Sequence, residues 1–409
     1  MLKRLIRISS LALAAALRAA EPAATVTIAP APVERAALVV KVPMPSSDLA
    51  SDLKGLCAFD ADGRAYPLQE DASRHFILVL GFVPANRSVN LELRHAEAKE
   101  AVHGDSHGED GLTISIRGRE HLNFRMDKTR KPRADISPDI LRAGYLHPVR
   151  SPSGAVVTGD YPSNHPHHHG IWTPYTQAIF QGRATDFWNM QNKKGRVDLD
   201  HANFLPTSKP GSGHPVFEQL AATLTMTDLT GPAPIPALHD HWTVRLYDVP
   251  SGLKPMVVFD LTTTQVCAGK DALELPEYHY GSFGLRGPDA WNGKEGARFL
   301  TSEGITDRKI GDGTRARWCY LGGKTSAGLS GTAVLGFPDN FRFPMPLRLH
   351  PDMPYFSIVP QKLGAFSIQP GKPYVTRYRC IVTDGEPVAK LFDACWNSLA
   401  HPAVVSVTK

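Results

Sequence analysis

The stretch Trp242-Thr243-Val244-Arg245-Leu246-Tyr247 is rich in β-branched and aromatic residues and predicts a β-strand. Segments of the same kind recur through the second half of the chain, each bounded by Gly, Pro, Asn or Asp. They lie at 220–226, 256–266, 332–337, 356–359 and 374–383. Regular helical segments do not alternate with these strands, which disfavours a parallel α/β sheet. We therefore predict a mainly β fold.

The first part of the chain carries shorter strand patterns, such as 37–42, and a hairpin-turn sequence at Asp60-Ala61-Asp62-Gly63. We predict a small β-sandwich over residues 23–102 and a polar linker over 103–111. A large antiparallel β-supersandwich, similar in type to galactose mutarotase-like domains, is expected over 112–409. Apolar residues at helical spacing predict one C-terminal helix: Val388, Leu391, Phe392, Cys395 and Leu399.

Composition narrows the class of protein. The 409 residues are 42% hydrophobic, enough to bury a sizeable core, and the formal net charge is +5. Lysine and arginine are spread along the chain without a basic stripe, so no nucleic-acid partner is expected. The five cysteines include no CxxC pair, which disfavours a thiolate zinc site.

Residues 1–20 have the layout of a secretory signal peptide. Lys3, Arg4 and Arg7 precede an apolar run over 8–17, and small residues follow. The run is too short to span a bilayer, and no later stretch reaches about 18 uninterrupted apolar residues. We expect an exported protein, periplasmic or extracellular, with no membrane span.

The densest concentration of reactive side chains is Asn164-His165-Pro166-His167-His168-His169-Gly170-Ile171-Trp172. In an extended backbone alternate side chains share a face, so His165, His167 and His169 are expected on one side and His168 on the other. Imidazoles at this spacing suit acid–base catalysis or coordination of one metal ion. The alternative is a hydrogen-bonded surface loop without a function of its own.

Three further segments supply candidate partners for the histidines. Asp186-Phe187-Trp188 offers a carboxylate and an aromatic face, the segment Glu277–Arg286 adds polar and aromatic groups, and 342–351 is a proline-fixed segment. Ordinary packing and surface roles are the alternative for each of them. We predict catalytic roles for His165, His167, His168 and Glu277, and substrate binding by Trp172, Asp186, Trp188, Tyr280, Arg286, Arg348 and His350.

A second His-x-His motif, His239-Asp240-His241, places two imidazoles on one strand face. It leaves open a divalent metal ion, such as Zn²⁺, Fe or Cu, as an alternative to pure acid–base chemistry. The ligands would then come from His165, His167, His169 and His241, with His279 or His350 as further candidates.

Several of these motifs together resemble the secreted bacterial family labelled "methane oxygenase PmoA". The similarity covers about residues 140 to 385, and the histidine motif is its most specific part. The family usually has arginine where this chain has His169, so only His165, His167 and His168 carry over as site candidates. The motifs are His165–Trp172, Asp186–Trp188, Tyr280–Arg286, Asn340–Pro346, Pro370-Gly371 and Arg377–Arg379.

The resemblance implies a β-rich exported protein of bacteria that degrade complex glycans. It does not imply methane oxidation, because a membrane monooxygenase subunit would consist of transmembrane helices. Our hypothesis is a carbohydrate-active enzyme, a hydrolase or lyase on a plant or algal saccharide. In it a histidine acts with Glu277 or Asp186, and Trp172 and Trp188 hold the sugar ring. A metal-dependent enzyme and a non-catalytic glycan-binding protein are the rival hypotheses.

Overall fold

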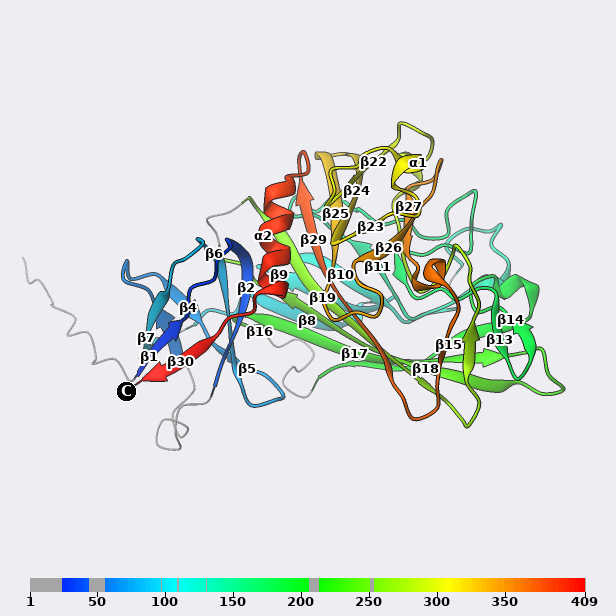
Figure 1. Cartoon of the computed structure of the whole chain (residues 1–409), viewed down its shortest axis with the longest axis horizontal. Helices are drawn as coiled ribbons and strands as arrows, with labels where there is room; N and C mark the ends of the chain where they lie inside the picture. Colours follow the sequence, from blue (N-terminus) through cyan, green and yellow to red (C-terminus); the bar gives the residue numbers. More distant parts are fainter. Residues whose placement is uncertain are drawn as a thin grey trace, which may run out of the picture.

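The computed structural model describes residues 24–43, 56–96, 98–108, 110–129, 131–205, 213–250 and 254–408. It is mainly β, with its strands in antiparallel sheets that pack as sandwiches and with a C-terminal helix, which confirms the predicted fold class (Figure 1). The segment predicted as a signal peptide, residues 1–20, lies outside the described residues. No helix in the described ranges is long and apolar enough to cross a membrane.

Two large sheets form the main sandwich. The eight-stranded sheet has the order β15 (Gly195–Phe204), β17 (Phe217–Asp228), β18 (Ile235–Tyr247), β19 (Met256–Cys267), β29 (Tyr374–Asp384), β25 (Gly328–Gly336), β24 (Trp318–Thr325), β22 (Ala297–Thr301). The ten-stranded sheet has the order β16 (Gly213–His214), β8 (Val102–Gly108), β9 (Gly111–Ile116), β10 (Arg119–Arg125), β11 (Tyr145–Val149), β12 (Ile171–Trp172), β21 (Phe283–Arg286), β27 (Tyr355–Ile358), β26 (Met345–Leu349), β23 (Arg315–Ala316).

Strict alternation along the strands builds the core between these two sheets. On β18 the side chains of Trp242, Val244 and Leu246 are buried inward, and those of Thr243 and Arg245 point out of the sandwich. Burial of each large apolar side chain contributes about 1.5–3 kcal/mol. A slip of one residue would place this apolar set in water, so the pattern fixes the register.

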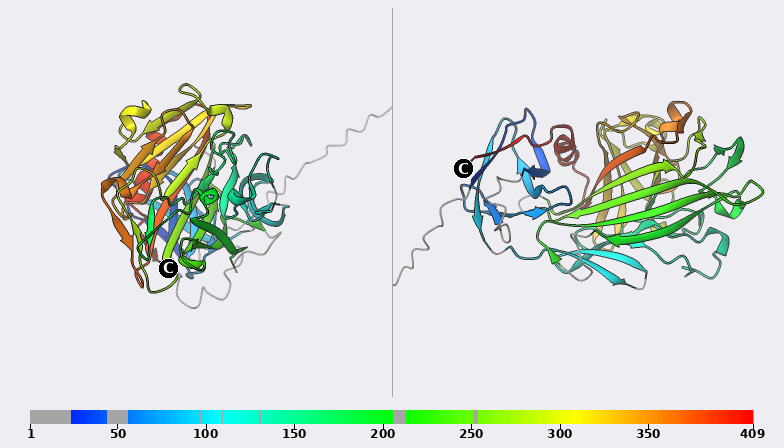
Figure 2. Two further views of the ribbon diagram at one scale, coloured as in Figure 1. Left: turned by 90° about the vertical axis from the view of Figure 1, so that its right-hand side faces the viewer. Right: turned by 90° about the horizontal axis from the view of Figure 1, so that it is seen from below.

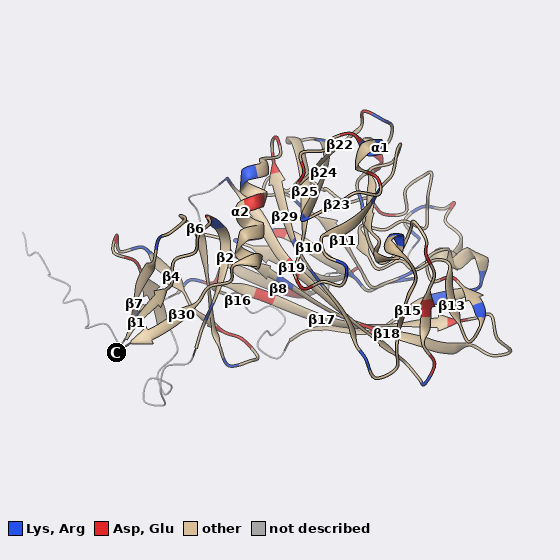
Figure 3. Ribbon diagram, viewed as in Figure 1, with Lys and Arg blue, Asp and Glu red and all other residues tan. Residues whose placement is uncertain are grey.

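The smaller elements cap the ends of the main sandwich. A four-stranded sheet of β14 (Arg183–Thr185), β13 (Ala178–Phe180), β20 (Leu273–Leu275) and β28 (Phe366–Ile368) lies at one end. The remaining helical turns are α1 (Arg308–Gly311), η2 (Pro138–Ile140), η3 (Met190–Asn192), η4 (Asp289–Trp291) and η5 (Pro360–Leu363). Basic and acidic residues are interspersed over the described elements (Figure 3).

The N-terminal residues form a small sandwich at the other end (Figure 2). One sheet has the order β30 (Val405–Thr408), β1 (Ala24–Ile28), β7 (Val89–His95), β3 (Leu56–Phe59), β4 (Ala65–Pro67), and the other β2 (Arg35–Val42), β6 (Phe76–Val83), β5 (Gln69–Glu70). Strand β30 pairs with β1, so the C-terminus of the chain returns to complete the N-terminal sandwich.

The predicted linker over 103–111 is largely a strand. β8 pairs with β9 and extends the ten-stranded sheet, with Val102 buried in the core. At Gly104 a Cβ atom would meet the ring of Phe204 at 2.7 Å, so a glycine is required where the sheets approach closely. The prediction of a linker rested on the polar composition of this segment. Polar side chains are tolerated in β8 because the strand lies near the edge of the sheet.

Helix α2 (Ala389–Ala400) joins the two sandwiches. It covers the outer face of the eight-stranded sheet next to β2, and the predicted apolar residues Leu391, Phe392, Cys395 and Leu399 pack in the cluster beneath it. Val388, also predicted in the stripe, precedes the helix and is exposed. Phe392 is fully buried, with its ring centroid 5.3 Å from that of Trp318 and 5.7 Å from that of Tyr320. The helix therefore depends on this aromatic contact more than on its own hydrogen bonds.

Replacing Phe392 by alanine should lower the free energy of unfolding by about 3–5 kcal/mol, because the removed ring leaves a cavity in a packed cluster. Urea unfolding measures the loss. Val388→Ala is the matched control, since Val388 is 43% exposed beside the same helix. Equal losses in the two variants would contradict the proposed dependence of α2 on the Phe392 contact.

Candidate functional site

The histidine stretch forms two successive turns instead of an extended strand. The backbone N–H of His165 donates to Pro162 O, and that of His168 donates to His165 O at 2.9 Å. The turns bring three imidazoles together, with ring centroids 5.6 Å apart for His165 and His167, 5.1 Å for His165 and His168, and 4.9 Å for His167 and His168. The predicted alternation was wrong, because it assumed extended backbone.

His169 points away from the other three histidines. Its Nδ1 lies 2.9 Å from Asp160 Oδ1, and the hydroxyl of Tyr145 donates to the other oxygen of that carboxylate at 2.9 Å. The ring also packs against Tyr161, with centroids 4.7 Å apart. Burial lowers the pKa of His169 to about 4 even though Asp160 opposes the shift. His169 therefore anchors the turn from below.

An aromatic layer lies between the histidine turn and the ten-stranded sheet. The His168 ring lies 4.8 Å from that of Tyr355 and 5.6 Å from that of Trp172, measured between centroids. Trp172 is fully buried, and a Cβ atom on Gly284 would lie 3.0 Å from its ring. Trp172 therefore packs beneath the histidine turn without access to a ligand, and it does not form the sugar-binding face that we predicted for it.

A cavity of about 260 Å³ opens between the histidine turn and the segments that surround it. Three predicted residues, His165, His167 and His168, line it together with Trp188 and Tyr280, which were also predicted. The indole N–H of Trp188 donates to His167 O at 3.2 Å, which fixes the ring at the wall. The remaining lining residues are Thr176, Asn189, Tyr278 and Met353.

Arg348 and His350, from β26 and the residue after it, approach the same site. Arg348 Nη2 donates to Tyr280 Oη at 3.0 Å, and its guanidinium lies 4.9 Å from the centre of that ring. The ring centroids of His350 and His165 are 6.3 Å apart. His350 Nδ1 accepts the backbone N–H groups of Asp352 and Met353, both at 3.1 Å, so Nδ1 carries no proton.

The imidazoles of this site are held neutral at pH 7. Burial lowers the pKa of His167 to about 4 and that of His168 well below its ordinary value, and the neighbouring histidines and Arg286 add to both shifts. Burial and nearby cations lower the pKa of His350 to about 4 in the same way. The buried Nδ1 atoms of His165 and His168 have no hydrogen-bond partner among the described residues. Because both nitrogens are buried, they are unsatisfied polar atoms beneath the surface of the cavity.

Arg286 places a buried positive charge beneath the histidine turn. Its Nη2 donates to Asn164, Asp289 and Asn292, at 3.2, 3.1 and 2.9 Å. Its Nε and Nη1 have no partner among the described residues, and the side chain is fully buried. Arg286 therefore positions the turn through Asn164 and makes the potential around the imidazoles positive, but it cannot contact a substrate directly.

The two predicted carboxylates occupy other roles. Asp186 accepts hydrogen bonds from the Thr176 hydroxyl and from Trp188 N and Asn189 N, so it holds the loop that carries Trp188. Glu277 is exposed and is not among the residues that line the cavity. The segment 277–282 is irregular, and β21 begins only at Phe283, because the backbone turns at Gly281 and Ser282 with φ of 142° and 61°.

His239 and His241 lie elsewhere, on the outer face of the eight-stranded sheet. Their Nδ1 atoms lie 2.9 and 3.0 Å from the hydroxyls of Thr225 and Thr223 on the neighbouring strand. Asp240 between them points inward and accepts from Thr173. His241 therefore cannot join the histidine cavity. In the described ranges, no group of three or more His, Cys, Asp or Glu side chains is arranged so that it could hold a metal ion.

Residues that the sequence reasoning missed are Thr176, Met353 and Tyr355. Met353 and Tyr355 lie just after the predicted segment 342–351, and Thr176 lies between two other predicted segments. No local pattern marks any of the three. Asn189 and Tyr278 lay inside segments already noted, but their neighbours were singled out instead. These residues belong to the site because the fold brings them close to the histidine turn, and this proximity cannot be read from the local sequence.

The chain belongs to a family of unknown function, DUF6807, whose model matches residues 111–397. The match contains the main sandwich from β9 onward, including the complete histidine cavity, and it brings no activity with it. A search of the curated proteins found no match to this sequence.

The unfolding free energy should fall as the pH decreases from about 6.5 to about 4. The lowered pKa values of His167, His169 and His350 mean that the unfolded chain binds more protons than the folded one in this window. His167→Gln should make the fall less steep, by at most about 1.4 kcal/mol per pH unit. Urea unfolding at successive pH values measures the slope.

His401→Gln is the control for that experiment, because it removes an exposed imidazole outside the cavity. A slope that is the same in wild type and His167→Gln would show that His167 titrates alike in both states, contrary to the burial described above.

Proposed function

We propose that the protein is an exported carbohydrate-active enzyme whose histidine cavity carries out proton transfer on a saccharide. The observation that carries the proposal is the convergence of neutral imidazoles, a phenol and an indole on one cavity of about 260 Å³. That volume accommodates about one sugar ring, since whole ligand sites usually measure about 300–1,000 Å³. The resemblance to an exported glycan-degrading family and the signal-peptide layout of residues 1–20 support the setting.

The wall of the cavity suits a sugar. Trp188 is largely buried, but the part of its indole that lines the cavity can pack against the C–H groups of a ring, and its own N–H is already bonded to His167 O. The hydroxyl of Thr176 and the amide of Asn189 lie beside it and can exchange hydrogen bonds with sugar hydroxyls. Asp186 keeps these groups in place.

The acid–base pair that we infer is His167 and Tyr280. His167 lines the cavity, is neutral at pH 7 and makes no hydrogen bond through its ring within the described part of the chain, so it can accept a proton. Tyr280 Oη already accepts a hydrogen bond from Arg348 Nη2, which leaves its own O–H free to donate to a leaving oxygen. The guanidinium would then balance the phenolate that donation leaves behind.

This pair fits a lyase better than a hydrolase. In a β-elimination, His167 takes the proton from the carbon next to a carboxylate, a carbon–carbon double bond forms, and the glycosidic oxygen leaves with the proton of Tyr280. Most glycoside hydrolases need two facing carboxylates, and the residues that line the cavity include none. A hydrolase would have to recruit exposed Glu277.

The electrostatics favour an acidic sugar as the substrate. Arg286 and Arg348 lie beside the cavity, while their partners Asp289 and Asp312 are not among the residues that line it. Arg286 also contributes to the lowered pKa of His165, His167 and His350. A base with a pKa of about 4 is weak, because proton transfer is most effective near the working pH. The carboxylate of a bound uronate would raise that pKa, so binding would activate the base.

Uronate-containing oligosaccharides should be cleaved with the appearance of an unsaturated product, seen as ultraviolet absorbance and by mass spectrometry. His167→Gln and Tyr280→Phe should each lower kcat by about 10²–10⁴-fold, because each removes one proton-transfer group and keeps the shape of the side chain. His241→Gln, on the far side of the main sandwich, is the control.

The outcomes separate the rival functions. Saccharide binding without product after long incubation would favour a non-catalytic glycan-binding protein. A stoichiometric ion in the purified protein, lost together with activity on chelation, would favour the metal-dependent rival. Full activity in both His167→Gln and Tyr280→Phe would overturn the assignment of the pair.

A further inference from the structure

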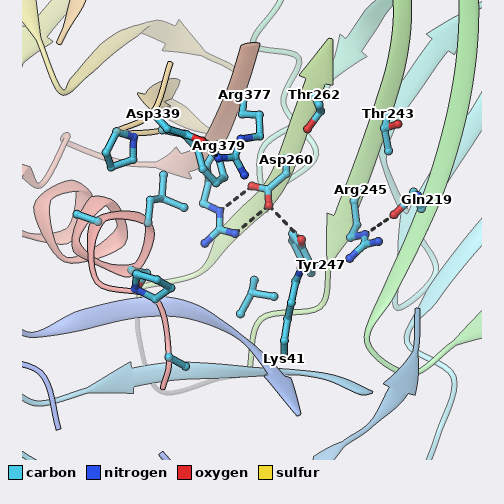
Figure 4. A pocket seen from close by; sticks show the side chains of 18 residues that line it. Lys41, Gln219, Thr243, Arg245, Tyr247, Asp260, Thr262, Asp339, Arg377 and Arg379 are labelled. Carbon is cyan, nitrogen blue, oxygen red and sulfur yellow. Dashed lines mark hydrogen bonds and ion pairs between the residues drawn. The ribbon is translucent and has the colours of Figure 1, made fainter. Parts of the chain in front are cut away.

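A second cavity, of about 630 Å³, lies on the outer face of the eight-stranded sheet (Figure 4). Strands β18, β19 and β29 form its floor, and β2 and the end of α2 form its sides. It is remote in structure from the histidine cavity, which lies on the outer face of the ten-stranded sheet. Its polar lining residues are Lys41, Gln219, Thr243, Arg245, Tyr247, Asp260, Thr262, Asp339, Arg377, Arg379 and Ser398.

One row of floor residues is saturated by its own contacts. Arg379 Nε and Nη2 donate to the two oxygens of Asp260 at 2.7 and 2.9 Å, and Arg379 Nη1 donates to Ala37 O at 3.0 Å. The hydroxyl of Tyr247 donates to Asp260 at 3.0 Å, and Arg245 Nε donates to the Gln219 side chain. Because these side chains bond mainly to one another and to the backbone, few of their donors and acceptors remain for a ligand.

The next row of the floor is open. Thr243, Thr262 and Arg377 stand side by side on neighbouring strands, in register with one another. The hydroxyls of Thr243 and Thr262 form no hydrogen bond within the described residues. Arg377 stacks over Phe337 at 4.6 Å from the ring centre and uses only Nη2 for its pair with Asp339. Two hydroxyls and the rest of a guanidinium therefore face the cavity together.

Lys41 completes the arrangement from the opposite side. It extends from β2 toward the floor, is exposed and forms no ion pair in the described ranges (Figure 4). Four cationic side chains, Lys41, Arg245, Arg377 and Arg379, line the cavity against the two carboxylates Asp260 and Asp339. Arg379 pairs with Asp260 and Arg377 with Asp339, and Arg245 lies 3.9 Å from Asp71 outside the lining. The charge left to a ligand is therefore the positive charge of Lys41.

We propose that this cavity is a second binding site, for a small acidic saccharide. An oxyanion, either a carboxylate or a sulfate ester, pairs with Arg377 and Lys41, and ring hydroxyls bond to Thr243, Thr262 and Asp339. Apolar side chains such as Leu399 and Pro402 line the rest and suit the C–H faces of a sugar ring. The volume holds about two rings. The inference goes beyond the proposed function and does not require it.

Calorimetric titration of the full chain with three trisaccharides tests the site: an oligogalacturonate, a sulfated one and a neutral one. At least one of the two acidic trisaccharides should bind, and the one that binds more tightly identifies the oxyanion as a carboxylate or a sulfate ester. The neutral trisaccharide should bind at least 10-fold more weakly. His167→Gln serves as the background for all titrations, so that binding is measured without turnover and apart from the outcome for the catalytic proposal.

Arg377→Gln should weaken the acidic ligand about 10-fold or more, and Lys41→Ala several-fold, because each removes one charge-assisted contact. Arg298→Gln and Lys270→Ala are the matched controls: Arg298 has a similar exposed ion pair with Glu386, and Lys270 is exposed without a partner in the described residues. The double variant Thr243→Val, Thr262→Val tests the hydroxyls at unchanged volume, which also covers a failure of Arg377→Gln to fold.

Weaker binding in the site variants, with the controls at wild-type affinity, supports the proposal. Unchanged binding in Arg377→Gln, Lys41→Ala and the threonine double variant overturns it. Equal affinity for the neutral trisaccharide, or for inorganic sulfate alone, overturns the assignment of an acidic saccharide.

Discussion

The close packing of Trp172 against Gly284 is the contact on which the site depends. Strands β12 and β21 are neighbours in the middle of the ten-stranded sheet, and a Cβ atom at position 284 would lie only 3.0 Å from the ring of Trp172. This contact lets a layer of Trp172, Tyr355 and Trp188 cover the sheet on the side away from the core. The histidine turn rests on that layer, and Arg286 of the same strand β21 reaches beneath it.

A sheet that is buried on both faces provides a rigid support. The inner face packs against the eight-stranded sheet, and the outer face packs under the aromatic layer, so the central strands have no solvent-facing side. Functional groups held on such a support lose less precision than groups on a mobile loop. The turn over 162–169 is irregular backbone, but His169 ties it to Asp160 and Asn164 ties it to Arg286.

Local patterns in the sequence were sufficient for the fold class, and they marked the segment around which the candidate cavity forms. The long strands β17, β18 and β19 of the eight-stranded sheet alternate buried and partly exposed residues over much of their length, and such a pattern can be recognised without knowledge of the neighbouring strands. The spacing of Phe392 and Cys395 identified α2 for the same reason. The concentration of His165, His167 and His168 marked a segment whose rings do converge on one cavity.

Other features depended on tertiary contacts that a local pattern does not contain. Which histidine faces away was decided by the turn hydrogen bond from His168 to His165 and by the pairing of His169 with Asp160. Asp186 looked like a ligand for hydroxyls, but its oxygens are used by its own loop. Trp172 and Trp188 each follow an apolar residue in the sequence. Only the fold shows that Trp172 is buried against Gly284, whereas Trp188 lines the cavity.

Cationic side chains lie beside both cavities, one on each outer face of the main sandwich. The histidine cavity lies above Arg286, whose carboxylate partner Asp289 is not among the residues that line the cavity. In the second cavity Lys41 has no ion pair within the described residues, and Arg377 uses only Nη2 for its pair with Asp339. A cation that faces a concave region attracts anions, so the second cavity, where Lys41 has no ion pair within the described residues, suits an anionic ligand. A polymeric acidic glycan held at the second cavity would raise the effective concentration of its other units near the protein. The reactive site and the charged cavity would then act on one kind of molecule from opposite faces of the same sandwich.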